Sequence, residues 1–193
     1  GFMKTTRRCT PLWSSHRSLD AKFTDFGGWT MPVQYRGILE EHSHTRSAVS
    51  VFDTCHMGEF VLEGPKVQAD LSRLVTSPVE RMAIGQCRYG LMLNHAGGIL
   101  DDLIVYRQDS HSYMLVVNAG TTQRDAEWIV SHLSTGTTFS DHSEQIGKID
   151  IQGPKSFEVL SAFVNIPLAS IQYYHFARGK LWEFDVLMSR TGY

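Results

Sequence analysis

Hydrophobic and polar residues alternate along the middle of the chain with the two-residue period of half-buried strands. The alternating segments predict strands at residues 58–64, 87–93, 99–106, 112–118 and 137–140. Two other segments have apolar residues at the three- and four-residue spacing of amphipathic helices, one beginning at Pro65 and one spanning about 121–134. Their apolar stripes are Val67, Leu71, Leu74 and Val75, and Ala126, Ile129, Val130 and Leu133. This order predicts an α+β fold, an antiparallel ferredoxin-like βαββαβ sheet with its helices on one face.

The flanking segments predict a second packing unit. Residues 38–49 are typical of a helix with a mostly polar face. The motif at 62–66, a strand end followed by Gly-Pro, recurs at 151–155, and an amphipathic helix is expected after each copy. A last strand is predicted at 180–188, and the chain stops soon after it. We therefore expect a unit that begins near residue 146 and is cut short.

Composition excludes several classes of protein. Hydrophobic residues make up 42% and charged residues 20% of the chain, which is typical of a globular protein with a buried core. The net charge of −2, without a large basic cluster, gives no electrostatic basis for nucleic-acid binding. No apolar run approaches the roughly 18 residues of a membrane span. The cysteines at 9, 55 and 87 form no disulfide pattern, which favours a reducing compartment.

Two adjacent carboxylates interrupt the apolar strand 99–106. Burial disfavours the charged form of a carboxylate, so Asp101 and Asp102 are costly in this place. Side chains alternate along a strand, which puts the two on opposite faces. We expect one of them to serve in catalysis or in holding a polar ligand.

The next strand brings an amide to this pair. Residues 112–118 are expected to return antiparallel after a turn at 108–111. If Asp102 and Asn118 face the same side, the pairing centres near Ser110 and the amide lies across from the carboxylate. The alternative interpretation is a turn-capping aspartate and an ordinary asparagine at a strand end.

Taken together, the motifs resemble those of the aminomethyltransferases, the T-proteins of the glycine cleavage system. The matching segments are 10–12 (TPL), 26–35 (FGGWTMPVQY), 41–42 with Arg46, 52–53 with 56–57, 97–104 (GGILDDLI), 117–120 (VNAG), 152–154 (QGP) and 190–193 (RTGY). The resemblance runs from about residue 10 to the last residue. Family members continue further, so the chain is similar to the N-terminal half of such an enzyme.

The resemblance implies a folate-binding fold of three domains around a central channel. Residues 3–52 plus 146–193 would form an incomplete, discontinuous first domain. Residues 53–145 would be the inserted sheet domain, and the third domain would be absent. Part of the folate site would then be missing, and we expect this fragment to be inactive by itself.

The family reaction moves an aminomethyl group from the lipoyl arm of H-protein to tetrahydrofolate and releases ammonia. The resemblance implies that Asp102 is the catalytic carboxylate beside folate N5, where it can accept or relay a proton. It also places Met57, Tyr89 and Asn118 against the folate and implies no metal. A bacterial member acts in the cytoplasm and a eukaryotic one in the mitochondrial matrix.

Several alternatives stay open at this point. The scaffold is shared by folate-dependent demethylases, by the folate domains of dimethylglycine and sarcosine oxidases, and by non-catalytic folate-binding proteins of iron–sulfur assembly. The last group lacks the strand carboxylate, so Asp102 argues against it. Cys55 is expected to be structural, Asp53 to cap or turn the chain, and His42 and His44 to lie on a solvated helix surface.

Overall fold

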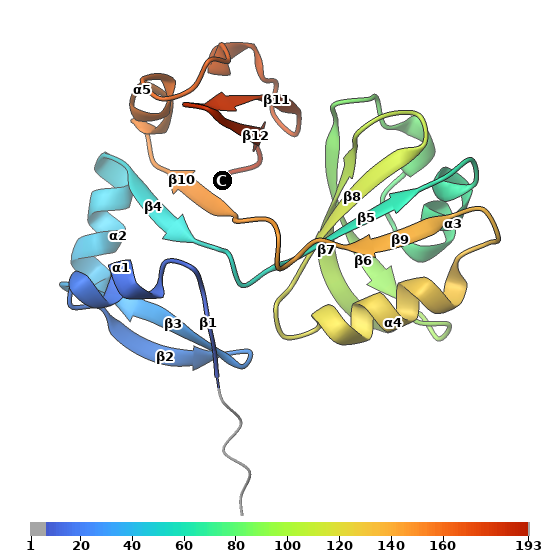
Figure 1. Cartoon of the computed structure of the whole chain (residues 1–193), viewed down its shortest axis with the longest axis horizontal. Helices are drawn as coiled ribbons and strands as arrows, with labels where there is room; N and C mark the ends of the chain where they lie inside the picture. Colours follow the sequence, from blue (N-terminus) through green and yellow to red (C-terminus); the bar gives the residue numbers. More distant parts are fainter. Residues whose placement is uncertain (1–6, 193) are drawn as a thin grey trace, which may run out of the picture. The chain divides into compact units, whose positions relative to one another are not determined.

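The structure is a computed structural model and describes residues 7–192. Contacts group the chain into two compact units, one of residues up to 56 with 147–160 and one of residues 57–146 with 161 onward (Figure 1). In this chain residues 161–192 pack with the central sheet, whereas the division into 3–52 plus 146–193 and 53–145 stays a prediction about the domains of the complete protein.

The first unit contains two small sheets. Strands β1 (Arg8–Cys9), β3 (Trp29–Gln34) and β2 (Lys22–Phe26) form one, and β4 (Ser50–Asp53) pairs antiparallel with β10 (Ile149–Gln152) in the other. The helices are α1 (Trp13–Ser18), α2 (Ile38–Ser47) and α5 (Ser156–Ser161). Helix α2 confirms the polar helix predicted over 38–49, because none of its residues is buried.

A polar network lies at the centre of this unit. The Asp53 carboxylate accepts hydrogen bonds from the Thr10 hydroxyl at 2.5 Å and the Cys55 backbone N–H at 3.0 Å, and its Oδ2 lies 2.8 Å from His16 Nε2. The other ring nitrogen of His16 lies 2.6 Å from the Tyr35 hydroxyl. Burial alone would raise the pKa of Asp53, but the hydrogen bonds from Thr10, His16 and Cys55 outweigh it and hold the pKa below its usual value.

Asp53→Ala is expected to lower the free energy of unfolding of this unit by about 3 kcal/mol, because it leaves buried donors without an acceptor. Denaturant unfolding followed by tryptophan fluorescence measures the loss. The control is Glu40→Ala, which removes an exposed carboxylate of α2 and should change stability by no more than about 0.5 kcal/mol. Equal losses in both variants would contradict a structural role for the network.

The second unit is built on one antiparallel sheet with strand order β6-β7-β8-β5-β9. Its strands are β5 (Gly58–Glu63), β6 (Cys87–Leu93), β7 (Ile99–Arg107), β8 (Ser112–Val117) and β9 (Thr138–Asp141). All five strands were predicted from the sequence, but they are one more than the βαββαβ formula contains. The additional strand is β6, which pairs with β7 at the edge of the sheet, so the fold class is confirmed as α+β but the four-strand description is incomplete.

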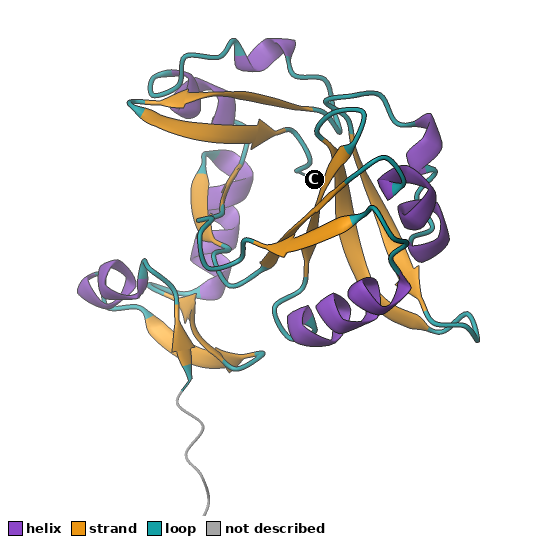
Figure 2. Ribbon diagram, turned by 45° about the vertical axis from the view of Figure 1, so that its right-hand side comes forward, coloured by secondary structure: helices purple, strands orange, loops and turns teal. Residues whose placement is uncertain are grey.

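Helices α3 (Val67–Leu74) and α4 (Thr122–His132) cover one face of this sheet, as predicted (Figure 2). Their buried residues join strand residues in one core: Phe60, Leu62, Val67, Leu71, Leu74, Leu103, Val105, Tyr113, Leu115 and Ile129. Val130, expected on the apolar face of the second helix, is instead 53% exposed. The opposite face carries a smaller cluster of Cys87, Tyr106, Met114 and Val116, against which Phe176 and Leu187 pack.

The repeated Gly-Pro motif marks a repeat of local structure. Each copy follows a strand and is followed by a helix, a single 3-10 turn (Val79–Arg81 or Leu168–Ser170) and a strand. Gly64 and Gly153 both have positive φ, at 134° and 123°. A Cβ on either would lie 2.0 Å or 2.4 Å from a backbone oxygen, so both positions require glycine.

The two copies also meet each other. The Cys87 N–H donates to the Tyr174 carbonyl at 2.8 Å, and the Phe176 N–H donates to the Gly85 carbonyl at 2.9 Å. Gly85 and Cys87 of the first copy correspond to Tyr174 and Phe176 of the second, so each copy donates one of these hydrogen bonds to the other. The single strand predicted over 180–188 is wrong: β11 (Phe176–Leu181) and β12 (Phe184–Ser189) form a hairpin, and Trp182 makes its turn with a φ of 53°. The turn contains no glycine, so the alternating pattern predicted one continuous strand across it.

Candidate functional site

The two adjacent carboxylates of β7 do point to opposite faces of the sheet. Asp101 is 6% exposed and lies on the helix-covered side, whereas Asp102 is exposed on the other side. The predicted register is also confirmed, because Ile104 pairs with Val116 and Tyr106 with Met114, which centres the hairpin on residue 110. Asp102 and Asn118 are therefore neighbours across the two strands.

Asn118 joins both carboxylates. Its Nδ2 lies 2.9 Å from an oxygen of Asp101 and 2.9 Å from an oxygen of Asp102, and its backbone N–H donates to Asp101 at 3.0 Å. An amide nitrogen carries two protons. Both can therefore be donated to carboxylates, which leaves the side-chain carbonyl oxygen of Asn118, Oδ1, as an acceptor beside Asp102.

Tyr89 and Met57 complete the set of predicted site residues. The Tyr89 hydroxyl lies 3.3 Å from Asp102, and the residue is 54% exposed. Met57 is partly buried and packs against the smaller apolar cluster. By strand alternation Tyr89 and Asp102 share the face of Cys87 and Ile104, so the structure brings the predicted site residues to the sheet face that the helices leave uncovered.

Asp101 forms the inner layer of the site. Besides Asn118, the Thr121 hydroxyl donates to it at 2.9 Å. Burial alone would raise the pKa of Asp101, but the hydrogen bonds from Asn118, Asp125 and Thr121 outweigh it and hold the pKa below its usual value. Asp101 is therefore the ionised, structural member of the pair, while Asp102 faces outward.

Asp125, at 0% exposure in the first turn of α4, was not singled out from the sequence. Burial first, and then hydrogen bonding and repulsion from Asp101, raise its pKa to about 7. A folded-state pKa above the unfolded value means that stability falls as pH rises from about 4 to about 7 and is constant above that range. One signal was available: Asp125 lies one helical turn before Ile129, on the predicted apolar stripe.

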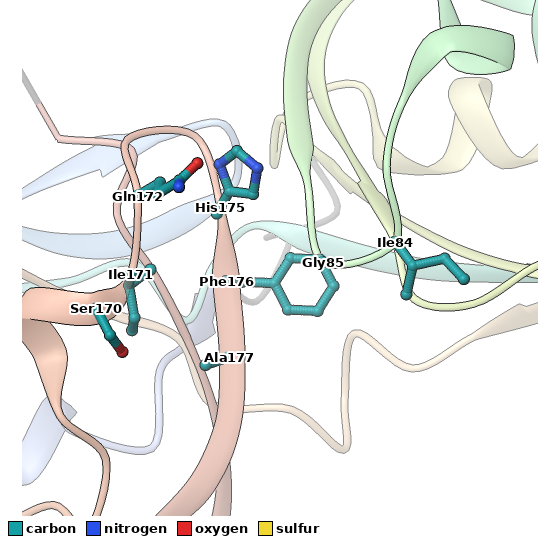
Figure 3. A pocket seen from close by; sticks show the side chains of 8 residues that line it. All are labelled: Ile84, Gly85, Ser170, Ile171, Gln172, His175, Phe176 and Ala177. Carbon is teal, nitrogen blue, oxygen red and sulfur yellow. The ribbon is translucent and has the colours of Figure 1, made fainter.

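One depression in the second unit lies apart from these residues. It has a volume of about 380 Å³ and is lined by Ile84, Gly85, Ser170, Ile171, Gln172, His175, Phe176 and Ala177 (Figure 3). These residues come from the loop before β6 and from the end of the second repeat. None of the predicted site residues lines it, and Asp102 is exposed on the surface of the second unit.

The cysteine and the two helix histidines considered in the sequence analysis lie where they were expected, Cys55 in a structural contact and His42 and His44 on a helix surface. The Cys55 thiol donates to the Lys148 carbonyl at 3.2 Å, and His42 and His44 lie exposed on α2. Between residues 7 and 192, no three His, Cys, Asp or Glu side chains gather as a metal site would require. None of the helices in that range is long and apolar enough to cross a membrane.

Known proteins match this chain over nearly its whole length. The family model of the GCVT N-terminal domain matches residues 12–193. An aminomethyltransferase of Chloroherpeton thalassium is 43% identical over 185 residues, which are 95% of this chain and 51% of the relative. One from Shouchella clausii is 40% identical over 192 residues, 99% of this chain and 52% of the relative. The chain belongs to the GCVT N-terminal domain family.

Structural comparison agrees with this family. The crystal structure of the glycine cleavage system aminomethyltransferase T from Bartonella henselae matches with a TM-score of 0.83 and 33% identity, over 90% of this chain and 48% of that chain. A heterotetrameric sarcosine oxidase from Corynebacterium sp. U-96 matches with a TM-score of 0.61 at 14% identity, which concerns the fold alone. The chain spans about half the length of the curated relatives it matches.

Proposed function

We propose that the protein containing this chain transfers the aminomethyl group of lipoylated H-protein to tetrahydrofolate and releases ammonia. The observation that carries the proposal is the open group of Asp102, Asn118 and Tyr89 on the helix-free face of the sheet, in a chain of the GCVT family. Relatives named aminomethyltransferase, about 40% identical over this length, support it.

The chemistry needs a proton acceptor at this place. In the transfer, the methylene carbon gives up its bonds to the amine and to the lipoyl sulfur and forms bonds to folate N5 and N10. The two N–H protons leave with the ammonia and the thiol. Asp102 would accept the N5 proton and stabilise positive charge that develops on the folate. The Asn118 carbonyl would accept a hydrogen bond from the pterin, and Met57 and Tyr89 would contact its ring.

The exposure of Asp102 sets a condition on this proposal. A carboxylate stabilises developing charge most strongly where water is excluded, and within the second unit Asp102 is exposed. Because the relatives are about twice as long, we propose that the remainder of the protein completes the folate site. The chain by itself is then expected to bind tetrahydrofolate weakly and to have no turnover.

The test uses the complete reading frame that encodes this chain. Purified protein is mixed with aminomethyl-loaded H-protein, and ammonia and methylene-tetrahydrofolate are measured with and without tetrahydrofolate. We expect both products only when tetrahydrofolate is present. Absence of turnover together with tight tetrahydrofolate binding would favour a non-catalytic folate-binding protein. Demethylation of a small methylated amine or sulfonium compound would instead favour another enzyme class on this scaffold.

A further inference from the structure

Asp125 has an unusual environment for a carboxyl group. It is fully buried between α4 and the sheet, and neither of its oxygens accepts an ordinary hydrogen bond from a described residue. The nearest cation, Arg124 Nε, is 3.9 Å away, too far for a hydrogen bond, and its guanidinium donates to the Leu100 carbonyl. A buried carboxylate without donors is costly, whereas a protonated carboxyl needs only one acceptor.

That acceptor is Asp101. Asp101 has donors from Asn118 and Thr121 on both of its oxygens, which stabilises it as the ionised partner. A proton shared between the two acids would therefore reside on Asp125, with Asp101 as its acceptor. The charged groups that act on Asp125 are Asp101 from β7 and Arg124 from its own helix, and Thr121 is the neutral polar neighbour.

The hydrogen bonds continue from this pair to the surface. Asp101 accepts from Asn118, and Asn118 donates its second amide proton to Asp102. A protonated Asp125, fully buried beside Asp101, would extend this chain inward by donating its O–H to Asp101. We propose that protonated Asp125 is a positioning residue of the Asp102 site, which locks Asp101 and thereby fixes the orientation of Asn118. Its role in folate chemistry rests on the proposed function, but the coupling from Asp125 to Asn118 does not.

Loss of the Asp125 proton would place two buried negative charges side by side. Repulsion would then displace Asp101 from Asn118, so the Asn118 amide would lose one of its acceptors and some of its order. The site is thus expected to change its geometry between about pH 6 and pH 8. Asp102 itself lies outside this buried pair and is joined to it by the Asn118 amide.

The direct test uses the chain itself, with ¹⁵N in asparagine and ¹³C in aspartate carboxyls. The side-chain amide signal of Asn118 is identified by its loss in Asn118→Ser. We expect this signal to shift between pH 6 and 8 with the same midpoint as one aspartate carboxyl. Both transitions should disappear in Asp125→Asn and persist in Glu127→Gln, which changes an exposed residue two positions further along α4. An Asn118 signal that does not move, or that still titrates in Asp125→Asn, would overturn the proposal.

The second arm uses the complete reading frame and kcat/KM as a function of pH. Asp125→Leu cannot donate to Asp101, so kcat/KM should fall by roughly tenfold or more at pH 6.5. Asp125→Asn keeps a donor, so it should retain more of the rate than Asp125→Leu. In the parent, kcat/KM should decline as pH rises through about 7, because Asp125 loses its proton, and this decline should be absent from Asp125→Asn. A decline that persists in Asp125→Asn would assign it to another group and overturn the catalytic part. If the wild-type protein has no aminomethyl transfer activity, the proposed function fails, and the spectroscopic arm still decides the coupling.

Discussion

Asp102→Asn is expected to lower tetrahydrofolate-dependent ammonia release by about 10²–10⁴-fold, the range that a positioned acid or base usually contributes. The substitution keeps the size of the side chain and can still contact Tyr89, but it removes the proton acceptor. The effect should be on kcat more than on the KM for tetrahydrofolate, because the proton is transferred in the reaction and not on binding. The measurement is steady-state ammonia release by the complete reading frame.

The matched control for this variant is Asp185→Asn. Asp185 is also an exposed strand aspartate, on β12 of the second repeat, and forms an ion pair with Lys180 at 2.7 Å. An exposed ion pair contributes little to stability, so this variant should fold and react as the parent does. If Asp102→Asn had turnover equal to that of Asp185→Asn, Asp102 would have no place in the reaction.

Asp70→Ala is expected to lower the free energy of unfolding of the second unit by about 3–5 kcal/mol. Asp70 is fully buried on α3 and accepts hydrogen bonds from Arg73 at 2.5 Å, the Ser134 hydroxyl at 2.6 Å and the Thr137 hydroxyl at 2.5 Å. It also accepts from the Ser134 backbone N–H at 3.1 Å. Truncation would leave these donors unpaired and detach the end of α4 from α3.

The pH dependence of Asp70 gives a second measurement. Burial alone would raise its pKa, but the hydrogen bonds from Ser134, Thr137 and Arg73 outweigh it and hold the pKa below its usual value. Its contribution to stability is therefore present above about pH 4 and is lost as pH falls through the lower folded pKa. Urea unfolding followed by circular dichroism should show this acid loss in the parent and in the control Glu127→Ala, but reduced in Asp70→Ala. A parent-like unfolding curve for Asp70→Ala would show that water replaces the carboxylate without cost.

The strands of the central sheet and much of their register could be predicted from the sequence, because they depend on patterns within short segments. Alternation marked every strand of the sheet, and Asp101 and Asp102 were assigned to opposite faces by the period of two alone. The hairpin register followed from Asn118 as well, since the short turn leaves few ways to pair the two strands. The Gly-Pro motif likewise located both helices that follow it, because Gly64 and Gly153 need a backbone conformation that other residues avoid.

Tertiary contacts decided what the local pattern left open. The hairpin turn at Trp182 carries no glycine, and only the pairing of β11 with β12 reveals it. The protonation of Asp125 depends on its burial against Asp101, 24 residues away (125 − 101) and on another element, which no window of sequence contains. The exposure of Asp102 is also a property of the folded chain. The sequence by itself therefore determined which residues share a strand face and which family the chain resembles, because strand periodicity and motifs are both contained in short stretches of the chain. Only the folded structure decided which acids are charged and which are buried, because burial and hydrogen bonding join residues that lie far apart along the chain.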